Sequence, residues 1–367
     1  MQIDFANLKI QHNLYKEEIE EAILKVARDC NFIMGSQIDE LEKNLEKFTG
    51  SKYAISCSSG TDALLLAMMA LDIQPDDEII TTPFTFFATA ETIAFLKAKP
   101  VFVDIDEKTY NIDPSKIEEK ITPKTKAIIP VSLYGQPADM DEINQIAKKY
   151  NLKVIVDGAQ SFGSTYKGIS DSNLGDISCT SFFPAKPLGC YGDGGALFTN
   201  DEKLADKIKS LRLHGQSIRY HHQYIGMGGR LDTIQAAVLN VKLKYYEKDL
   251  KLRQDVAEKY TKALNVKNIE TPFVKSDRAS AWAQYSIRVQ NRTELQTKLQ
   301  NLGIPTAVHY PMPLHVQECF KYLKLKEGDF PISEKVSKEI MSLPMNPYVS
   351  DEEIEFIVEN LAKELRC

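Results

Sequence analysis

The chain has 367 residues, of which 43% are hydrophobic and 26% charged, and its formal net charge at pH 7 is −6. This length allows one large domain and a smaller one, and the composition is ordinary for a globular protein. The chain lacks the excess of positive charge that nucleic-acid-binding proteins carry, so we expect no nucleic-acid partner.

The first residues, MQIDFANLKIQHNLYKEE, carry charges where a signal peptide has an apolar core. The longest apolar run, 63–71, is far shorter than the roughly 20 residues that a membrane span requires. We therefore expect a cytoplasmic protein with no membrane partner. The cysteines show no CxxC pairing, which favours a reducing compartment; they are residues 30, 57, 179, 190, 319 and 367.

Strands and helices alternate along the first half of the chain. Apolar residues at helical spacing predict helices at 15–29 and 38–48. Further helices are predicted at 62–71, 87–97, 114–120 and 139–150, and strands at 53–57, 78–82, 101–104, 127–133 and 153–157. The alternation predicts an α/β domain with a mostly parallel central sheet covered by helices on both faces.

In the second half of the chain the regular alternation of strands and helices ends. A second apolar run, 179–183, and a strand at 196–199 precede a helix at 201–213. One long charged helix is predicted at 231–260, and we interpret it as a bridge between two domains. Beyond it we expect a half-solvated strand and three helices, at 283–290, 293–302, 333–341 and 351–364. This pattern predicts a smaller C-terminal α+β domain, and we divide the chain into 1–245 and 246–367.

Two residues of this region carry chemistry that belongs together. Asp157 ends the strand 153–157, and in parallel α/β sheets ligands bind outside the carboxyl ends of the strands. Lys186 lies between Pro184 and Pro187 and is followed by several glycines, so its backbone is constrained. A lysine amine can form a Schiff base with pyridoxal phosphate, while an acid keeps the pyridine nitrogen protonated. The plainer alternatives are a solvated surface lysine and an aspartate that caps a helix or a turn.

Together these residues resemble the motifs of the DegT/DnrJ/EryC1/StrS family, the nucleotide-sugar aminotransferases among the fold-type I pyridoxal-phosphate enzymes. The resemblance runs from about Asp4 to Met345. It implies a fold-type I PLP-transferase architecture with pyridoxal 5′-phosphate as cofactor. It also implies that Lys186 is the Schiff-base lysine, that Asp157 is the pyridinium partner and that Gln160 lies beside the phenolic oxygen of the ring.

Further cofactor contacts follow from the same resemblance. Gly60 and Thr61 open an apolar helix, where free N–H groups can bind a phosphate, although the segment is also an ordinary helix cap. Ser181 matches a serine that supplies another phosphate contact. Phe86 aligns with an aromatic residue that stacks on the cofactor ring; its alternative is packing in the core.

Substrate contacts are expected further along the chain. Arg230 occupies the Arg-Leu-Asp position of the family, and a guanidinium suits carboxylate or phosphate; its alternative is an ion pair with a nearby acid. Relatives usually have an asparagine where this chain has Gly228, and it reaches the phosphate in the neighbouring subunit's site. Gly228 cannot make that side-chain contact, although the N–H groups of Gly228 and Gly229 could form an anion-binding nest. His309 and Tyr310 match a family segment near the sugar. No spacing of His, Asp and Glu resembles a zinc site, so we expect no metal.

The resemblance implies a two-step aminotransferase that uses L-glutamate and a nucleotide-linked keto sugar. The acceptor that we favour is a UDP-2-acetamido-2-deoxy-3-keto sugar, hexose or hexuronate, which would supply lipid A, lipopolysaccharide or another cell-surface polysaccharide. One alternative is a 4-keto-6-deoxy or 3-keto-6-deoxy sugar linked to dTDP, UDP or GDP, and a second is a non-enzymatic regulator that binds pyridoxal phosphate. The dehydratase branch of the family replaces the lysine by histidine, and Lys186 argues against it. We expect a homodimer with shared active sites.

Overall fold

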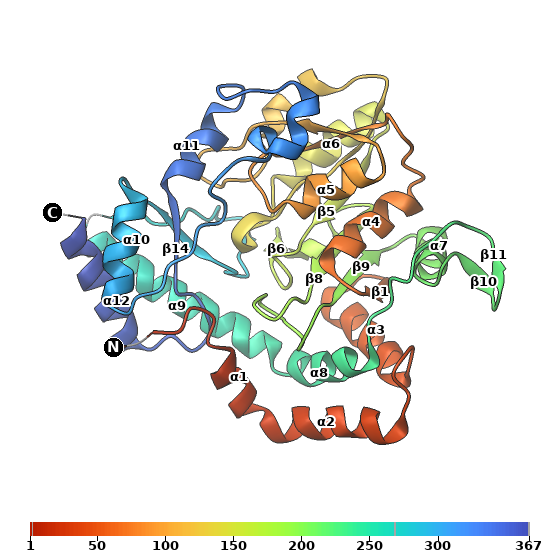
Figure 1. Ribbon diagram of the computed structural model, residues 1–367, viewed down its shortest axis with the longest axis horizontal. Helices are drawn as coiled ribbons and strands as arrows, with labels where there is room; N and C mark the ends of the chain where they lie inside the picture. The colour runs from red at the N-terminus through yellow and green to blue at the C-terminus, as the bar shows by residue number, and fades with distance from the viewer. Residues whose placement is uncertain (2, 268, 366–367) are drawn as a thin grey trace.

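The computed structural model describes residues 1, 3–267 and 269–365 (Figure 1). A seven-stranded sheet in the order β1-β9-β8-β5-β4-β2-β3 forms its centre. The strands are β1 (Tyr53–Cys57), β2 (Glu78–Thr81), β3 (Lys99–Phe102), β4 (Thr125–Ile128), β5 (Lys153–Asp157), β8 (Ile177–Ser181) and β9 (Gly195–Thr199). Only β9 runs antiparallel to its neighbours, β1 and β8. The predicted mostly parallel sheet is confirmed.

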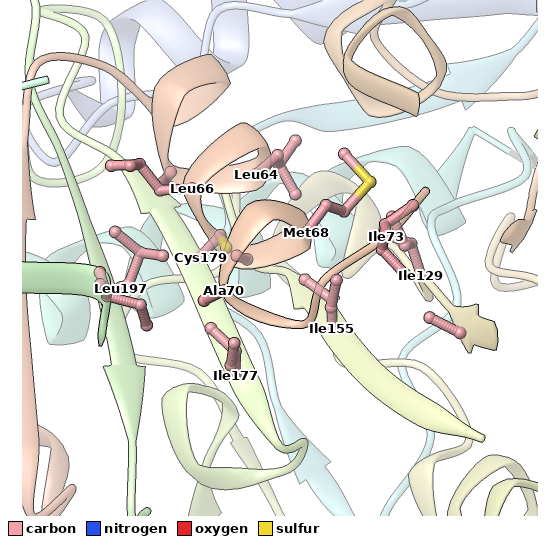
Figure 2. Close-up of a cluster of buried hydrophobic side chains, with 14 of the residues drawn as sticks. Leu64, Leu66, Met68, Ala70, Ile73, Ile129, Ile155, Ile177, Cys179 and Leu197 are labelled. Carbon is pink, nitrogen blue, oxygen red and sulfur yellow. The ribbon is translucent and has the colours of Figure 1, made fainter. Parts of the chain in front are cut away.

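Side chains of the central strands are buried on both faces. On β5, Ile155 points to one face and belongs to one apolar cluster, and Val154 and Val156 point to the other face and share a second cluster. The first cluster lies between the sheet and the helices α4 (Gly60–Ala70), α5 (Ala88–Phe95) and α7 (Glu202–Arg212) (Figure 2). The opposite face is covered by α3 (Ser36–Thr49), α6 (Met140–Tyr150) and α8 (Thr233–Leu243). Because both faces are covered, the strands are nearly continuous apolar runs.

The predicted helix at 231–260 is wrong in one respect, because the chain forms two helices there. The helix α8 ends at Leu243, and α9 (Tyr246–Val266) begins after Lys244 and Tyr245. The Tyr245 ring stacks on Tyr15 with 4.1 Å between ring centroids, and its hydroxyl donates to Glu18. Both partners flank or belong to α2 (Lys16–Asp29), so packing on α2 holds the break while α9 turns toward the C-terminal elements (Figure 1).

A second core lies at the C-terminal end of the chain. The elements there are α10 (Arg292–Asn301), α11 (Pro331–Glu339), α12 (Asp351–Glu364) and the antiparallel pair β13 (Tyr285–Arg288) and β14 (Ile340–Leu343). With the second half of α9, all of these elements except α11 enclose one apolar cluster, which Ile3 from the N-terminus also joins; Val336 of α11 belongs to a different cluster. The division of the chain at 245/246 stays a prediction. The packing of Ile3 means that the N-terminal segment contributes to the C-terminal core as well.

Several boundaries differ from those that the periodicity predicts. The helix expected at 333–341 ends at Glu339, and the apolar residues that follow it form β14. The helix expected at 114–120 consists of two short 3₁₀ turns, Pro114–Lys116 and Glu118–Lys120. The remaining elements are α1 (Leu8–Leu14), a three-stranded sheet of β6 (Thr165–Tyr166), β7 (Ile169–Ser170) and β12 (Arg278–Ala279), and a hairpin of β10 (Gln216–Ile218) and β11 (His221–His222).

The cysteines and the membrane expectation can be compared with the described residues. Cys57, Cys179 and Cys190 are buried and unpaired, and Cys30 and Cys319 are exposed and unpaired. Cys367, the sixth, lies outside the described residues. Along 1, 3–267 and 269–365, every helix is too short or too polar to cross a membrane.

Candidate active site

A cavity of about 470 Å³ opens at the carboxyl ends of β5 and β8, between the sheet and the C-terminal elements. Nine of the ten predicted site residues line it, and Arg230 does not. These nine are Gly60, Thr61, Phe86, Asp157, Gln160, Ser181, Lys186, His309 and Tyr310. The volume lies within the range of small-molecule sites.

Asp157 is 4% exposed, and its carboxylate is held from two directions. Thr89 Oγ1 donates to Oδ2 at 2.7 Å, and the Ala159 N–H donates to Oδ1 at 3.2 Å. Burial raises the pKa of Asp157, and these two hydrogen bonds and the charge of Lys186 oppose the rise. Asp157 therefore does form a turn, as the plainer alternative held, but it also presents its carboxylate to the cavity.

Lys186 lies on the cavity wall in the loop between β8 and β9. Burial lowers the pKa of Lys186, and the charge of Asp157 partly offsets this effect. Within the described part of the chain, its amine has neither an ion pair nor a hydrogen bond. The alternative of a solvated surface lysine does not hold.

Gln160 connects two segments of the cavity wall. Its Oε1 accepts from the Tyr134 N–H at 2.8 Å, and its Nε2 donates to the Tyr310 hydroxyl at 3.0 Å. The Tyr134 hydroxyl in turn donates to the His309 carbonyl. His309 Nδ1 lies 2.9 Å from Ser342 Oγ, and burial together with the charge of Lys186 lowers the pKa of His309 to about 4. His309 is therefore neutral near pH 7.

Phe86 is 55% exposed, so the alternative that it packs in the core is excluded. Its ring lies 5.9 Å from that of Tyr310, measured between centroids, on the wall of the cavity. An exposed aromatic ring beside a buried carboxylate offers a flat ligand one apolar face.

The opposite end of the cavity is the N-terminus of α4. Ser59 caps this helix by accepting the Asp62 N–H at 3.0 Å, and the preceding N–H groups, of Gly60 and Thr61, have no partner within the helix. A Cβ atom at Gly60 would lie 2.6 Å from Ser181 Cβ, so only glycine allows this close approach. The segment is a helix cap, and its free N–H groups together with Ser181 fit a phosphate.

Arg230 does not line the cavity of its own chain but follows a segment that lies beside the N-terminus of α4. The Gly229 carbonyl accepts the Ser58 N–H at 3.1 Å, which fixes this segment beside the α4 N-terminus. The expected ion pair of Arg230 with a nearby acid is absent among the described residues. The expected anion nest is wrong for Gly229, because its N–H donates to the Arg212 carbonyl at 3.0 Å.

The sequence did not single out several residues that shape the site. Thr89 holds Asp157, Tyr134 holds Gln160, and Gln284 lies on the cavity wall. Thr89 belongs to the motif FTFFAT, in which the prediction named only the aromatic residue Phe86. His221 and His222 lie exposed on the β10–β11 hairpin and do not line the cavity.

Across 1, 3–267 and 269–365, no group of three or more His, Cys, Asp or Glu residues could hold a metal ion. The cavity instead combines four features that fit pyridoxal phosphate: an amine without a counter-ion, a buried carboxylate, an exposed aromatic face and a free helix N-terminus. Each contributes a different contact, so the fit does not depend on one of them alone.

Comparisons with known proteins agree with this chemistry. Residues 13–362 match the DegT/DnrJ/EryC1/StrS aminotransferase family. UDP-2-acetamido-2-deoxy-3-oxo-D-glucuronate aminotransferase from Pseudomonas aeruginosa is 52% identical over 97% of this chain and 98% of its own. A protein of Geobacillus stearothermophilus named pleiotropic regulatory protein is 44% identical over 99% and 98% of the two chains.

A solved structure extends the likeness to three dimensions and to the cofactor. NtdA from Bacillus subtilis, solved with the bound cofactor PMP, superposes with a TM-score of 0.93 at 32% identity. The match covers 100% of this chain and 86% of that one. The chain thus belongs to the DegT/DnrJ/EryC1/StrS aminotransferase family and is a fold-type I sugar aminotransferase with pyridoxal 5′-phosphate as its cofactor.

Proposed function

We propose that this chain transfers the amino group of L-glutamate to the 3-keto group of a UDP-linked 2-acetamido-2-deoxy-3-keto hexuronate. The observation that carries the proposal is the single cavity in which Lys186, Asp157 and the N-terminus of α4 meet. The acceptor is supported by the relative from Pseudomonas aeruginosa, whose name states that sugar and whose likeness extends over 97% of this chain.

Lys186 is the residue proposed to hold the cofactor and to move the proton. When bound, the cofactor supplies an aldehyde that an amine can attack and a ring that accepts electrons. The lowered pKa of Lys186 increases the fraction of its amine that is neutral, and only a neutral amine can attack the aldehyde. Once displaced by the amino donor, the same amine can take the proton from the donor's α-carbon and return it elsewhere.

Asp157 is proposed to stabilise a positive charge at the ring nitrogen. Its carboxylate is buried, and it has no cationic partner at contact distance in the described part of the chain. A positive charge next to it would therefore reverse the effect of burial and lower its pKa. Thr89 and Ala159 hold both carboxylate oxygens in place, so the carboxylate is oriented before the ligand arrives.

The other wall residues are proposed to orient the ring and the phosphate. Phe86 would offer the ring an apolar face, and the N–H groups at the start of α4 would hold the phosphate with Ser181. Gln160 is fixed between Tyr134 and Tyr310. The nucleotide is expected to extend outward from the cavity, on the side where Arg230 has no partner in the described chain.

The assembly and the setting are part of the proposal. We infer a homodimer, supported by the exposed apolar side chains Ile218, Tyr220 and Ile225 in and after the β10–β11 hairpin, which projects from the body in Figure 1. The protein would act in the cytoplasm on a sugar destined for lipopolysaccharide or another cell-surface polysaccharide. Sedimentation should show no stable monomer at micromolar concentration.

The test begins with the purified protein and pyridoxal phosphate. Borohydride reduction followed by peptide mass spectrometry should place the cofactor on Lys186, and Lys186→Ala should give no adduct. The protein is then supplied with L-glutamate and one of three acceptors: a UDP-2-acetamido-2-deoxy-3-keto hexuronate, the matching hexose, or a dTDP-4-keto-6-deoxy hexose. Turnover fastest with the hexuronate supports the proposal.

The other outcomes assign the alternatives. Turnover only with the 4-keto-6-deoxy sugar would contradict the proposed acceptor while leaving the aminotransferase intact. Cofactor binding without turnover of any keto sugar, together with full cellular function of Lys186→Ala, would favour the regulator instead.

A further inference from the structure

A second, smaller cavity of about 80 Å³ lies on the other side of Lys186. It shares four wall residues with the larger cavity, and these are Ala185, Lys186, Gln284 and His309. Its remaining walls come from the N-terminal segment, the C-terminal core and α9, which contributes Arg253. The lysine amine therefore lies between two spaces, and the proposed cofactor contacts account for only one of them.

Among the described residues, Arg253 is a buried cation that forms no ion pair, although the charge of Asp249 partly offsets the effect of burial on its pKa. It is 6% exposed, and its one hydrogen bond runs from Nη1 to the Trp282 carbonyl at 3.0 Å, while its Nε is buried with no partner. No carboxylate of the described residues forms an ion pair with it. Asp249 lies one turn earlier on α9, but its carboxylate accepts from Gln11 at 2.9 Å and from Tyr348 at 3.2 Å.

Such a charge is costly to bury. Burial lowers the pKa of Arg253, yet a guanidinium does not lose its proton in proteins, so the charge remains. A buried charge is ordinarily paired with an opposite charge. The wall of the cavity holds a second unsatisfied group, because Gln284 Oε1 is buried without a partner. Turning this amide by 180° would present its NH₂ group instead, which donates two hydrogen bonds.

We propose that Arg253 binds the α-carboxylate of the amino donor in this smaller cavity. The inference rests on the proposed function, in which the donor is an α-amino acid. Lys186 must reach the α-carbon to move its proton, and the α-carboxylate is bonded to that same carbon. Of the two cavities in the described chain that Lys186 lines, only the smaller one is also lined by Arg253, so we place this carboxylate there.

The chemistry of the neighbours agrees with this assignment. His309, which also lines this cavity and can carry a positive charge, is neutral near pH 7 and offers no competing charge. A guanidinium can donate two parallel hydrogen bonds to one carboxylate, which also orients the α-carbon. The cavity volume suits a carboxylate and a few further atoms, so the donor side chain would point toward the larger cavity.

The test measures binding separately from turnover. Calorimetry on the cofactor-loaded protein gives the Kd of L-2-methylglutamate, which has both carboxylates but no α-proton to lose, and of 4-aminobutyrate, which lacks the α-carboxylate. Arg253→Met should raise the first Kd by about 10- to 100-fold, as expected for the loss of hydrogen bonds between charged groups. The second Kd should not change. Arg253→Lys keeps the charge but not the two-pronged geometry, and its Kd should fall between those of the wild type and Arg253→Met.

Arg292 provides a matched control. It also donates only to carbonyls, those of Ser337 and Ile340, its Nε is buried without a partner, and burial lowers its pKa, but it lines neither cavity. Arg292→Met should leave both Kd values unchanged. A purely structural role of Arg253 predicts a lower melting temperature of Arg253→Met with unaltered Kd values.

Two results would overturn the inference. One is an equal Kd of L-2-methylglutamate in the wild type and Arg253→Met, and the other is no binding of this ligand to the wild type. The acceptor half of the reaction is measured separately, with protein loaded with the pyridoxamine form of the cofactor. Failure of every keto sugar there would reject the proposed acceptor, whereas the carboxylate-binding result would stand.

Discussion

Thr89→Val tests how the carboxylate of Asp157 is stabilised inside the fold. The Thr89 hydroxyl donates to Asp157 Oδ2 at 2.7 Å, and both residues are buried. Valine has nearly the shape of threonine but lacks the hydroxyl. A hydrogen bond to a charged group contributes about 1.5–3 kcal/mol, and one between neutral groups about 0.5–1.5 kcal/mol. The variant should lose the larger amount where Asp157 is ionised and the smaller amount where it is protonated.

The sign of the pH dependence follows from the direction of the pKa. Burial raises the pKa of Asp157 above its unfolded value, so the folded protein retains this proton at pH values where the unfolded chain has lost it. Ionising Asp157 therefore reduces stability as the pH rises through that interval. Removing the Thr89 hydroxyl raises the pKa further, which deepens the loss at high pH.

The assay is thermal unfolding of the cofactor-free protein at pH 8.0 and pH 4.5. With an unfolding entropy of about 2.1 cal/mol/K per residue, 367 residues give about 0.8 kcal/mol/K, so the variant should melt about 2–4 °C lower at pH 8.0. The shift at pH 4.5 should be smaller, because a larger fraction of the buried Asp157 is protonated there than at pH 8.0. The Thr89 hydroxyl also contacts the Thr85 hydroxyl at 3.1 Å, and this contact between neutral groups contributes equally at both pH values.

Thr92→Val is the matched control on the same helix. Thr92 is 2% exposed, and its hydroxyl donates to the neutral Ala88 carbonyl at 2.9 Å. Its loss should be the same at both pH values. An equal loss at both pH values for Thr89→Val as well would refute the reasoning, because it would mean that the hydroxyl does not stabilise an ionised Asp157.

Three further predictions concern the surroundings of the site. Burial lowers the pKa of His309 from 6.5 to about 4, so the free energy of unfolding should fall by about 3 kcal/mol as the pH drops through this window. Urea unfolding of His309→Gln should lack this fall, and an unchanged fall would contradict the lowered pKa. Glu42→Gln leaves the buried Arg212 guanidinium without its carboxylate and should lower the free energy of unfolding in urea by about 3–5 kcal/mol. Replacing both residues by apolar ones should lower it less, and a loss below about 1 kcal/mol for Glu42→Gln would show that the pair is not desolvated. Gly60→Ala places a Cβ atom against Ser181 and should weaken cofactor binding, measured by fluorescence titration, on the order of 10- to 100-fold; unchanged affinity would place the phosphate elsewhere.

The sequence alone determined those parts of the protein that rest on local patterns. The strands 53–57 and 153–157 and the helix 351–364 have the predicted bounds, because each is a strongly patterned run between clear breaks. The helix α12 begins at a capping box formed by Ser350 and Glu353, which is a purely local signal. Asp157 and Lys186 could be predicted because neighbouring residues identify them: Asp157 ends an apolar strand, and Lys186 lies between Pro184 and Pro187.

Only the tertiary structure decided which side chains meet across the fold. The contact of Thr89 with Asp157 joins residues 68 positions apart, and the contact of Tyr134 with His309 joins residues 175 apart. The break between α8 and α9 depends on the packing of Tyr245 against Tyr15, next to α2. Arg253 forms no ion pair among the described residues, and the Asp249 carboxylate accepts hydrogen bonds from Gln11 and Tyr348 instead. Such contacts leave no periodic trace in the chain, since hydrophobic spacing records which face of an element is buried but not which residue lies opposite.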